Sequence, residues 1–231
     1  YTNDFTGYPS ILNIESFVDF ILLQEFSKNV DAYRLSTYIY KDKESIDNRL
    51  TAGPVWDFNH GLGNCDYGET WEVDNWLLEY NPEGGDQMAF WWELLWEDEN
   101  FQLKVAQRFT ELRSTIFSEG HINNVIDSIT TYLGPAIDRN FTRWPLLGNY
   151  IWPNYYIFET YDEEIDYLKS WAADRLAWMD SEILLKIDKP VTLSNHKINK
   201  PFPNPFNSQT IFTTEIKQNS EILLRIYNLL G

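Results

Sequence analysis

The chain has 231 residues, a formal net charge of −17 at pH 7 and 43% apolar residues, with ten Trp, 14 Tyr and 14 Phe. That length and apolar content can fill one sizeable core and leave a small appendage. The negative charge argues against nucleic acid as a partner, and no run of 18 apolar residues is present to span a membrane.

The charge is unevenly distributed along the chain. Residues 1–186 carry 32 acidic and 13 basic residues, whereas residues 187–231 carry three acidic and five basic ones. All ten Trp lie in the first part. A change of composition of this kind marks a domain boundary, so we expect one domain over residues 1–186 and a different module after it.

Few residues are suited to thiol or zinc chemistry. Cys65 is the single cysteine, which fits a reducing compartment or a cysteine-poor secreted protein equally well. Its position in a loop without a clear His partner favours a structural thiol. The three histidines, His60, His121 and His196, are scattered and do not form a zinc pattern.

The first predicted elements are a helix and two strands. Apolar residues recur at helical spacing over residues 14–30, with Asn13 or Ser16 available to cap the start. Residues 33–40 and 50–56 alternate like strands around a polar turn.

The second strand leads into Gly-Pro-Val-Trp-Asp-Phe-Asn-His-Gly-Leu-Gly, residues 53–63. If Trp56 and Phe58 anchor one face of the strand, Asp57 points to the other face, and Asn59 follows at the strand end. Hard oxygen ligands of this kind suit Mg²⁺. The alternative is a strand-to-turn junction with a solvated Asp and glycines that only allow the bend.

A second isolated carboxylate, Asp31, lies at the expected helix-to-strand junction, 26 residues before Asp57. Together, the residues Asn29, Asp31 and Tyr33, then Tyr38-Ile39-Tyr40-Lys41-Asp42, then Gly53-Pro54-Val55-Trp56-Asp57-Phe58-Asn59 resemble the core of the CotH family. CotH proteins are atypical, secreted-type protein kinases. The resemblance covers about residues 1–185.

The resemblance implies roles for four residues. Asp31 matches the catalytic-loop aspartate, which accepts the proton of the substrate hydroxyl. Asp57 matches the aspartate that holds Mg²⁺ (or Mn²⁺) against the ATP phosphates. Asn59 stands where many family members carry a second Asp, and a carboxamide ligates with less charge. Ser36, five residues after Asp31, stands where kinases tend to place a metal-binding Asn, so we include it among the nucleotide-site candidates.

A kinase also needs a Gly-rich loop and a strand Lys from an amino-terminal lobe. Neither precedes the motifs here, and the first lysine, Lys28, falls at the end of the first helix. We therefore expect these residues to be the carboxy-terminal part of a longer protein and to be inactive alone.

Residues 63–86 show no periodicity but many acids, namely Asp66, Glu69, Glu72, Asp74, Glu79, Glu83 and Asp86. A loop of that length in a compact domain is usually functional. It occupies the place of a kinase activation and substrate-docking segment. A solvated acidic excursion, with or without bound Ca²⁺, is an equal alternative.

The rest of the first domain is expected to be helical. Residues 86–118 predict one or two helices, and residues 121–139 predict another that Pro135 should kink. Residues 162–186 predict a last long helix with acids in its first turn. Trp-rich helical faces such as these are typical of a core rather than of a ligand platform.

The last part changes to a linker over residues 187–207 and alternating strands at 210–216 and 221–227. Its Pro-Asn-Pro-Phe-Asn at 203–207 and closing Ile-Tyr-Asn-Leu-Leu-Gly resemble the sorting domain of type IX secretion. That resemblance implies a truncated β-sandwich over residues 208–231 and export through the periplasm to the cell surface by the type IX machinery.

The sequence thus predicts an α+β fold: a mainly helical, kinase-like carboxy-terminal lobe with a short β-hairpin, followed by a partial β-sandwich. The expected activity is phosphorylation of Ser or Thr on a secreted or surface protein. Two alternatives stay open, a non-catalytic surface protein that keeps the fold for binding, and a carbohydrate-active domain with paired carboxylates.

Overall fold

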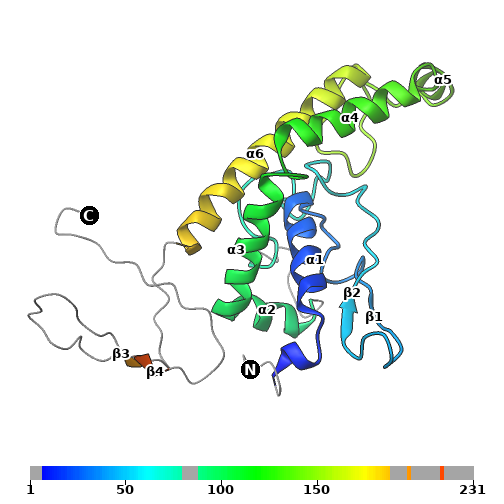
Figure 1. Ribbon diagram of the computed structural model, residues 1–231. Coiled ribbons are helices and arrows are strands. Elements are labelled where there is room, and N and C mark those ends of the chain that lie inside the picture. The colour runs from blue at the N-terminus through cyan, green and yellow to red at the C-terminus, as the bar shows by residue number, and fades with distance from the viewer. Residues whose placement is uncertain (1–6, 80–87, 188–196, 199–213, 216–231) are drawn as a thin grey trace, which may run out of the picture. The chain divides into compact units, whose positions relative to one another are not determined.

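Figure 1 shows the computed structural model of the chain, which describes residues 7–79, 88–187, 197–198 and 214–215. Its contacts divide the chain into two compact units, Tyr1–Asp188 and Lys189–Gly231. The first unit contains the two aspartate motifs and most of the secondary structure.

In chain order, the elements of the first unit are the 3-10 helix η1 (Tyr8–Ser10), α1 (Ile14–Ser27), β1 (Ile39–Lys41), β2 (Leu50–Ala52), α2 (Phe90–Glu97), α3 (Glu99–Arg113), α4 (Glu119–Leu133), α5 (Ala136–Arg143) and α6 (Tyr161–Ile187). This mixture of helices with one small antiparallel sheet is the expected α+β class.

Helix α1 is the centre of the first unit. Asn13 caps it, because the Asn13 side chain accepts a hydrogen bond from the backbone N–H of Ser16 at 3.2 Å. The helix ends three residues earlier than predicted, since Lys28 takes the left-handed conformation with φ 43° and ψ 46°. That early turn carries the chain into the first aspartate segment.

The hairpin is shorter than the sequence pattern predicts. Strands β1 and β2 pair antiparallel, with Tyr40 opposite Thr51. Residues 31–36 are turns rather than strand, because the N–H groups of Arg34, Leu35 and Ser36 all donate to the carbonyl of Asp31, at 3.3, 3.1 and 2.9 Å. The predicted strand over 33–40 therefore keeps only its last part.

The core lies where α1 packs against α3 and α6 (Figure 1). Trp92 of α2 is fully buried there, stacked on Phe20 with ring centroids 5.4 Å apart and tilted against Phe17 at the same distance. The expectation that Trp-rich helical faces are core holds for Trp92 and Trp96, whereas Trp91 of the same helix is exposed.

The predicted kinked helix over 121–139 is two helices. Gly134, with φ 43°, ends α4, and Pro135 precedes the first residue of α5. Helix α4 lies along α6, where Lys169 pairs with Asp127 at 2.5 Å.

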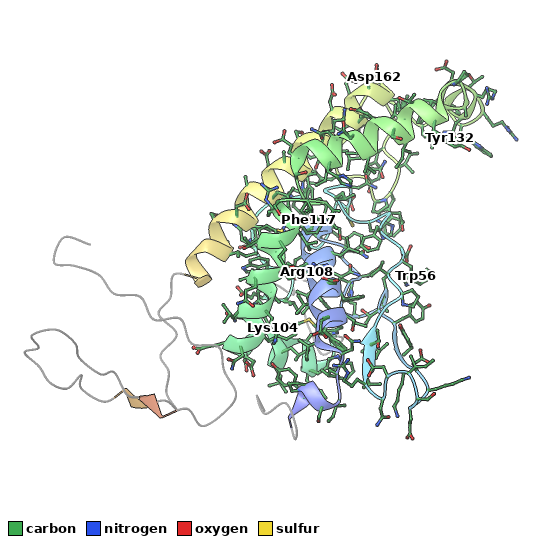
Figure 2. All side chains as sticks on the ribbon, in the orientation of Figure 1. Trp56, Lys104, Arg108, Phe117, Tyr132 and Asp162 are labelled. Atoms are coloured by element: carbon green, nitrogen blue, oxygen red, sulfur yellow. The ribbon has the colours of Figure 1, made fainter. Side chains whose placement is uncertain are left out.

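The long helix α6 begins with a capping carboxylate. Glu163 accepts hydrogen bonds from the backbone N–H groups of Glu159 and Thr160, at 3.1 and 2.9 Å. Asp162, labelled in Figure 2, marks this first turn. Among the described residues, none of the helices combines the length and the apolar character that a membrane span requires.

In the second unit, β3 (Lys197–Ile198) pairs antiparallel with β4 (Thr214–Glu215). Strand β4 falls within the predicted strand 210–216, while its pairing with β3 was not anticipated. The predicted strand 221–227, the Pro-Asn-Pro-Phe-Asn segment and the closing motif lie outside the described residues. The β-sandwich therefore stays a prediction.

Candidate functional site

The side chain of Asn29 joins the two aspartate segments. Its Nδ2 donates to the backbone carbonyl of Asp57 at 3.2 Å, and its Oδ1 accepts from the backbone N–H of Asp31 at 3.4 Å. Asn29 is fully buried, with 0% of its surface exposed. Because one buried amide contacts both segments, Asp31 and Asp57 are held at one place in the fold.

Ser36 makes a second connection between them. Its hydroxyl donates to Oδ2 of Asp57 at 3.3 Å, while its backbone N–H donates to the carbonyl of Asp31 at 2.9 Å. Ser36 is buried, with 2% exposure, and Asp57 is exposed. Three of the four residues chosen from the sequence therefore come together, with the Asp57 carboxylate open to solvent.

The strand-face argument for Asp57 is wrong in its details. Strand β2 ends at Ala52, so Asp57 lies in a loop rather than at a strand end. Trp56 is no core anchor: it is 47% exposed and rests on the Tyr38 ring at 5.6 Å, at the edge of the first unit in Figure 2. Asp57 instead adopts a left-handed φ of 65°. Strained positions of this kind persist when their surroundings fix them, and here Asn29 and Ser36 do so.

Arg34 is a member of the site that the motif did not single out. Its Nη2 lies 3.1 Å from Oδ1 of Asp31, and both side chains are 18% exposed. A guanidinium fixed beside the carboxylate can also receive a phosphate oxygen. The only sequence signal for this pair was the spacing of three residues within a turn.

Asn59 is the one of the four candidates that the structure does not bring together with the others. Its carbonyl accepts from Nδ2 of Asn64 at 2.9 Å, while its exposed side chain makes no hydrogen bond within the described residues. Among those residues, no three His, Cys, Asp or Glu side chains gather to hold a metal ion by themselves. The Asp57 carboxylate would hold Mg²⁺ as a partial ligand, which phosphate oxygens and water would have to complete.

The acidic loop is held by buried cations through its backbone. The Lys28 ammonium donates to the carbonyls of Glu69, Glu72 and Asp74 at 3.1, 2.9 and 2.8 Å. Burial, reinforced by the nearby Arg175, lowers the pKa of Lys28 from 10.5 to about 8. The carboxylates of those three loop residues remain exposed. The described part of the loop around these three residues is thus held by its backbone while their carboxylates face solvent.

Arg175 of α6 and Glu25 of α1 complete this anchor. The Arg175 guanidinium is fully buried and donates to the carbonyl of Glu25 at 2.9 and 2.8 Å and to those of Val73 and Asn75 at 2.7 and 2.9 Å. Its Nη2 lies 3.4 Å from the Glu25 carboxylate.

The Glu25 carboxylate in turn accepts from the backbone N–H groups of Leu77 and Leu78, at 2.7 and 3.0 Å, and from the Tyr33 hydroxyl at 2.8 Å. We refer to Glu25, Lys28 and Arg175 as the anchor network. Sequence reasoning missed it, although charged residues within apolar helical stripes were a signal.

Tyr67, His60 and Trp152 form an aromatic group. The Tyr67 hydroxyl is 3.4 Å from Nδ1 of His60, and the Tyr67 ring is parallel to that of Trp152 at 6.1 Å. Burial raises the pKa of Tyr67, with further increases from Cys65 and from the Asp31 charge. Cys65 is fully buried, and burial raises the pKa of its thiol, which fits the structural role expected for it.

One known protein family has a model that matches most of the chain. The model of the family described as CotH kinase protein matches residues 2–179. No curated protein and no solved structure matches the chain. The matched range covers α1, the hairpin, both aspartate segments, the acidic loop and most of α6. The chain therefore belongs to the CotH kinase protein family.

Proposed function

We propose that this protein transfers the γ-phosphate of ATP, with Mg²⁺, to Ser or Thr hydroxyls of a secreted or surface protein. The observation that supports this most is the pair of hydrogen bonds by which Asn29 and Ser36 hold Asp57 next to the Asp31 segment. One carboxylate for the proton and one for the metal is the minimum that phosphoryl transfer of the kinase type needs.

In this proposal Asp31 orients the acceptor hydroxyl and takes its proton as the oxygen forms its bond to the γ-phosphorus. The bond from that phosphorus to the bridging oxygen of ADP breaks at the same time. Arg34, 3.1 Å from Asp31, would bind an equatorial phosphate oxygen. Mg²⁺, when bound through Asp57, supplies charge neutralisation on the phosphates. Ser36 keeps the Asp57 carboxylate oriented.

A specific observation supports a second candidate, a non-catalytic surface protein that keeps the fold for binding. Ser36 occupies one oxygen of Asp57, and the Asn59 side chain makes no hydrogen bond to it within the part of the chain that is described. A metal site with fewer charged ligands binds Mg²⁺ more weakly.

The location of the protein is part of the proposal. The resemblance of residues 203–207 and 226–231 to a type IX sorting domain supports export through the periplasm to the cell surface, with the type IX machinery as a partner. These residues lie outside the described part of the structure.

The test uses the complete encoded protein. Mg²⁺ and ATP together should raise its melting temperature, and neither should do so alone, because one carboxylate makes a poor Mg²⁺ site without phosphates. Asp57→Asn should remove the shift. Asp31→Asn should keep the shift but abolish transfer of labelled γ-phosphate to Ser/Thr peptides.

Asp174→Asn is the matched control, since Asp174 is an exposed acid on α6 that is none of the four candidate residues. A shift that persists in Asp57→Asn would contradict the metal role. Nucleotide binding without any transfer by the unsubstituted protein would favour the non-catalytic candidate.

A further inference from the structure

A cavity of about 380 Å³ lies beside the glycine turn at Gly61–Asn64. It is bounded by Gly61–Asn64, by the segment 146–158 and by the first turns of α6. The volume is in the range of pockets that hold small molecules. None of the four candidate residues for phosphate transfer lines it.

One wall of the cavity is an ordered aromatic cluster. Tyr167 packs against Tyr156 and Phe158, with ring centroids 4.6 and 5.4 Å apart, and its hydroxyl donates to the carbonyl of Gly63 at 3.0 Å. Phe141 and Tyr161 form a further pair at 5.9 Å that lines the same space. The wall is fixed before any ligand enters, so ring faces and edges are available at no cost in ordering.

A carboxylate lines this aromatic space, that of Glu164. Within the described residues it has no hydrogen-bond or ion-pair partner, whereas its neighbour Glu163 caps the helix. Burial raises the pKa of the Glu164 carboxyl, and no hydrogen bond opposes that increase. The cavity is lined by no Lys or Arg among the residues described. A half-buried carboxylate without a partner is stabilised when a cation binds beside it.

The aromatic cavity with Glu164 at its side points to a binding site for an organic ammonium group, which we propose as a further function of this protein. Aromatic faces attract such cations, and the carboxylate adds the opposite charge. A divalent metal would need several more oxygen ligands than this cavity presents, and the carboxylate repels anions. The site is independent of the proposed phosphate transfer.

The ammonium could come from a free small amine or from a lysine side chain of a peptide, and the experiment distinguishes the two. Isothermal titration of the complete protein would use three probes: choline, its uncharged isostere 3,3-dimethylbutan-1-ol, and a short peptide with one central lysine. We expect choline or the lysine peptide to bind at least about fivefold tighter than the isostere. Tighter choline binding assigns a free amine, and tighter peptide binding assigns a side chain.

Two substitutions test the residues. Glu164→Gln keeps the shape of the side chain and should reduce the preference for the charged probe. Phe158→Leu keeps the cavity apolar and should weaken the charged probe about fivefold with little change for the isostere. The control Asp166→Asn removes an exposed acid from the same helix and should leave binding unchanged. Equal affinity for charged and uncharged probes, unchanged binding in Glu164→Gln, or no saturable binding by the folded protein would each overturn the proposal.

Discussion

The Ser36 hydroxyl donates a hydrogen bond to Oδ2 of Asp57 at 3.3 Å, across 21 residues of sequence. A neutral hydroxyl here occupies the place where kinases tend to put a metal-binding carboxamide. This contact gives the proposed metal ligand a fixed orientation, and at the same time it uses one of the two oxygens of that ligand. A kinase needs this contact to orient Asp57, whereas a non-catalytic binding protein does not.

Removing the hydroxyl tests that contact. In the complete protein, Ser36→Ala should lower the rate of phosphate transfer about tenfold, because the Asp57 carboxylate loses its orienting donor, while the stability falls by no more than about 1.5 kcal/mol. Ser36→Thr keeps a hydroxyl and should retain most of the rate. Equal rates in Ser36→Ala and the unsubstituted protein would show that the contact does not position Asp57 for transfer.

Asn29 should contribute more to the stability of the folded protein than Ser36 does. Asn29→Ala leaves the carbonyl of Asp57 and the N–H of Asp31 without their buried partner, so we expect the free energy of unfolding in urea to fall by about 1–3 kcal/mol. Asn149, which donates to the carbonyls of Pro145 and Leu147 at 3.3 and 3.1 Å from an exposed position, supplies the control. Asn149→Ala should cost less than half as much, and a reversed order of the two costs would refute the bridging role of Asn29.

These contacts explain why the sequence predicted the elements of the fold better than the site. Helix α1 could be located from its apolar spacing, but its end depended on Lys28 turning left-handed to reach three carbonyls more than 40 residues ahead. The strand before Asp57 was predicted too long for a similar reason. Local alternation favoured a strand, whereas the hydrogen bonds from Asn29 and Ser36 hold Asp57 in a loop.

The anchor network could not be predicted for the same reason, because it depends on contacts between residues far apart in the sequence. Glu25 and Arg175 lie 150 residues apart. In the local sequence, each is only a charged residue within an apolar helical stripe. Only the packing of α1 against α6 brings them together. The aspartates themselves could be chosen early, because a family motif records the outcome of such long-range contacts.

The anchor network leads to a prediction about buried charge. Arg175→Leu should lower the free energy of unfolding by about 3–5 kcal/mol, since it leaves the Glu25 carboxylate buried without its cation and frees the carbonyls of Val73 and Asn75. The double variant Glu25→Gln/Arg175→Leu should lose clearly less than the sum of the two single losses. Additive losses would mean that Glu25 and Arg175 do not interact.

Lys28 gives the protein a pH dependence of known sign. Its pKa is about 8 in the folded protein and 10.5 ordinarily, so the folded state releases the proton first as the pH rises. The unfolded chain then binds more protons, and the stability increases with pH above about 8. Between about pH 7.5 and 9 Lys28 should add about 1 kcal/mol. Cys65 offsets part of that gain, because burial raises the pKa of its thiol in the folded state while the unfolded chain begins to lose the thiol proton in this range.

Urea denaturation at several pH values measures that gain. Lys28→Met should remove the rise in stability with pH, and Lys104→Met, which removes an exposed lysine, should retain it. Should Lys28→Met fail to fold, the NMR titration of the Lys28 side chain in the unsubstituted protein gives the same information. A midpoint near the ordinary 10.5 would contradict the lowered pKa.

The last prediction concerns the part of the chain after residue 190, which we expect to act as an export address rather than as part of the catalytic domain. The charge changes sign near Lys186, all ten Trp lie before it, and contacts divide the chain between Asp188 and Lys189. A separate unit contributes little to the stability of its neighbour.

Deleting residues 191–231 should therefore leave the melting temperature of the first unit within about 2 °C, and should hold the complete protein in the periplasm of its host. Replacing the same residues with a Gly/Ser segment of equal length controls for the loss of chain length. If the deletion unfolds the first unit, the tail belongs to its core and the export role loses its physical basis.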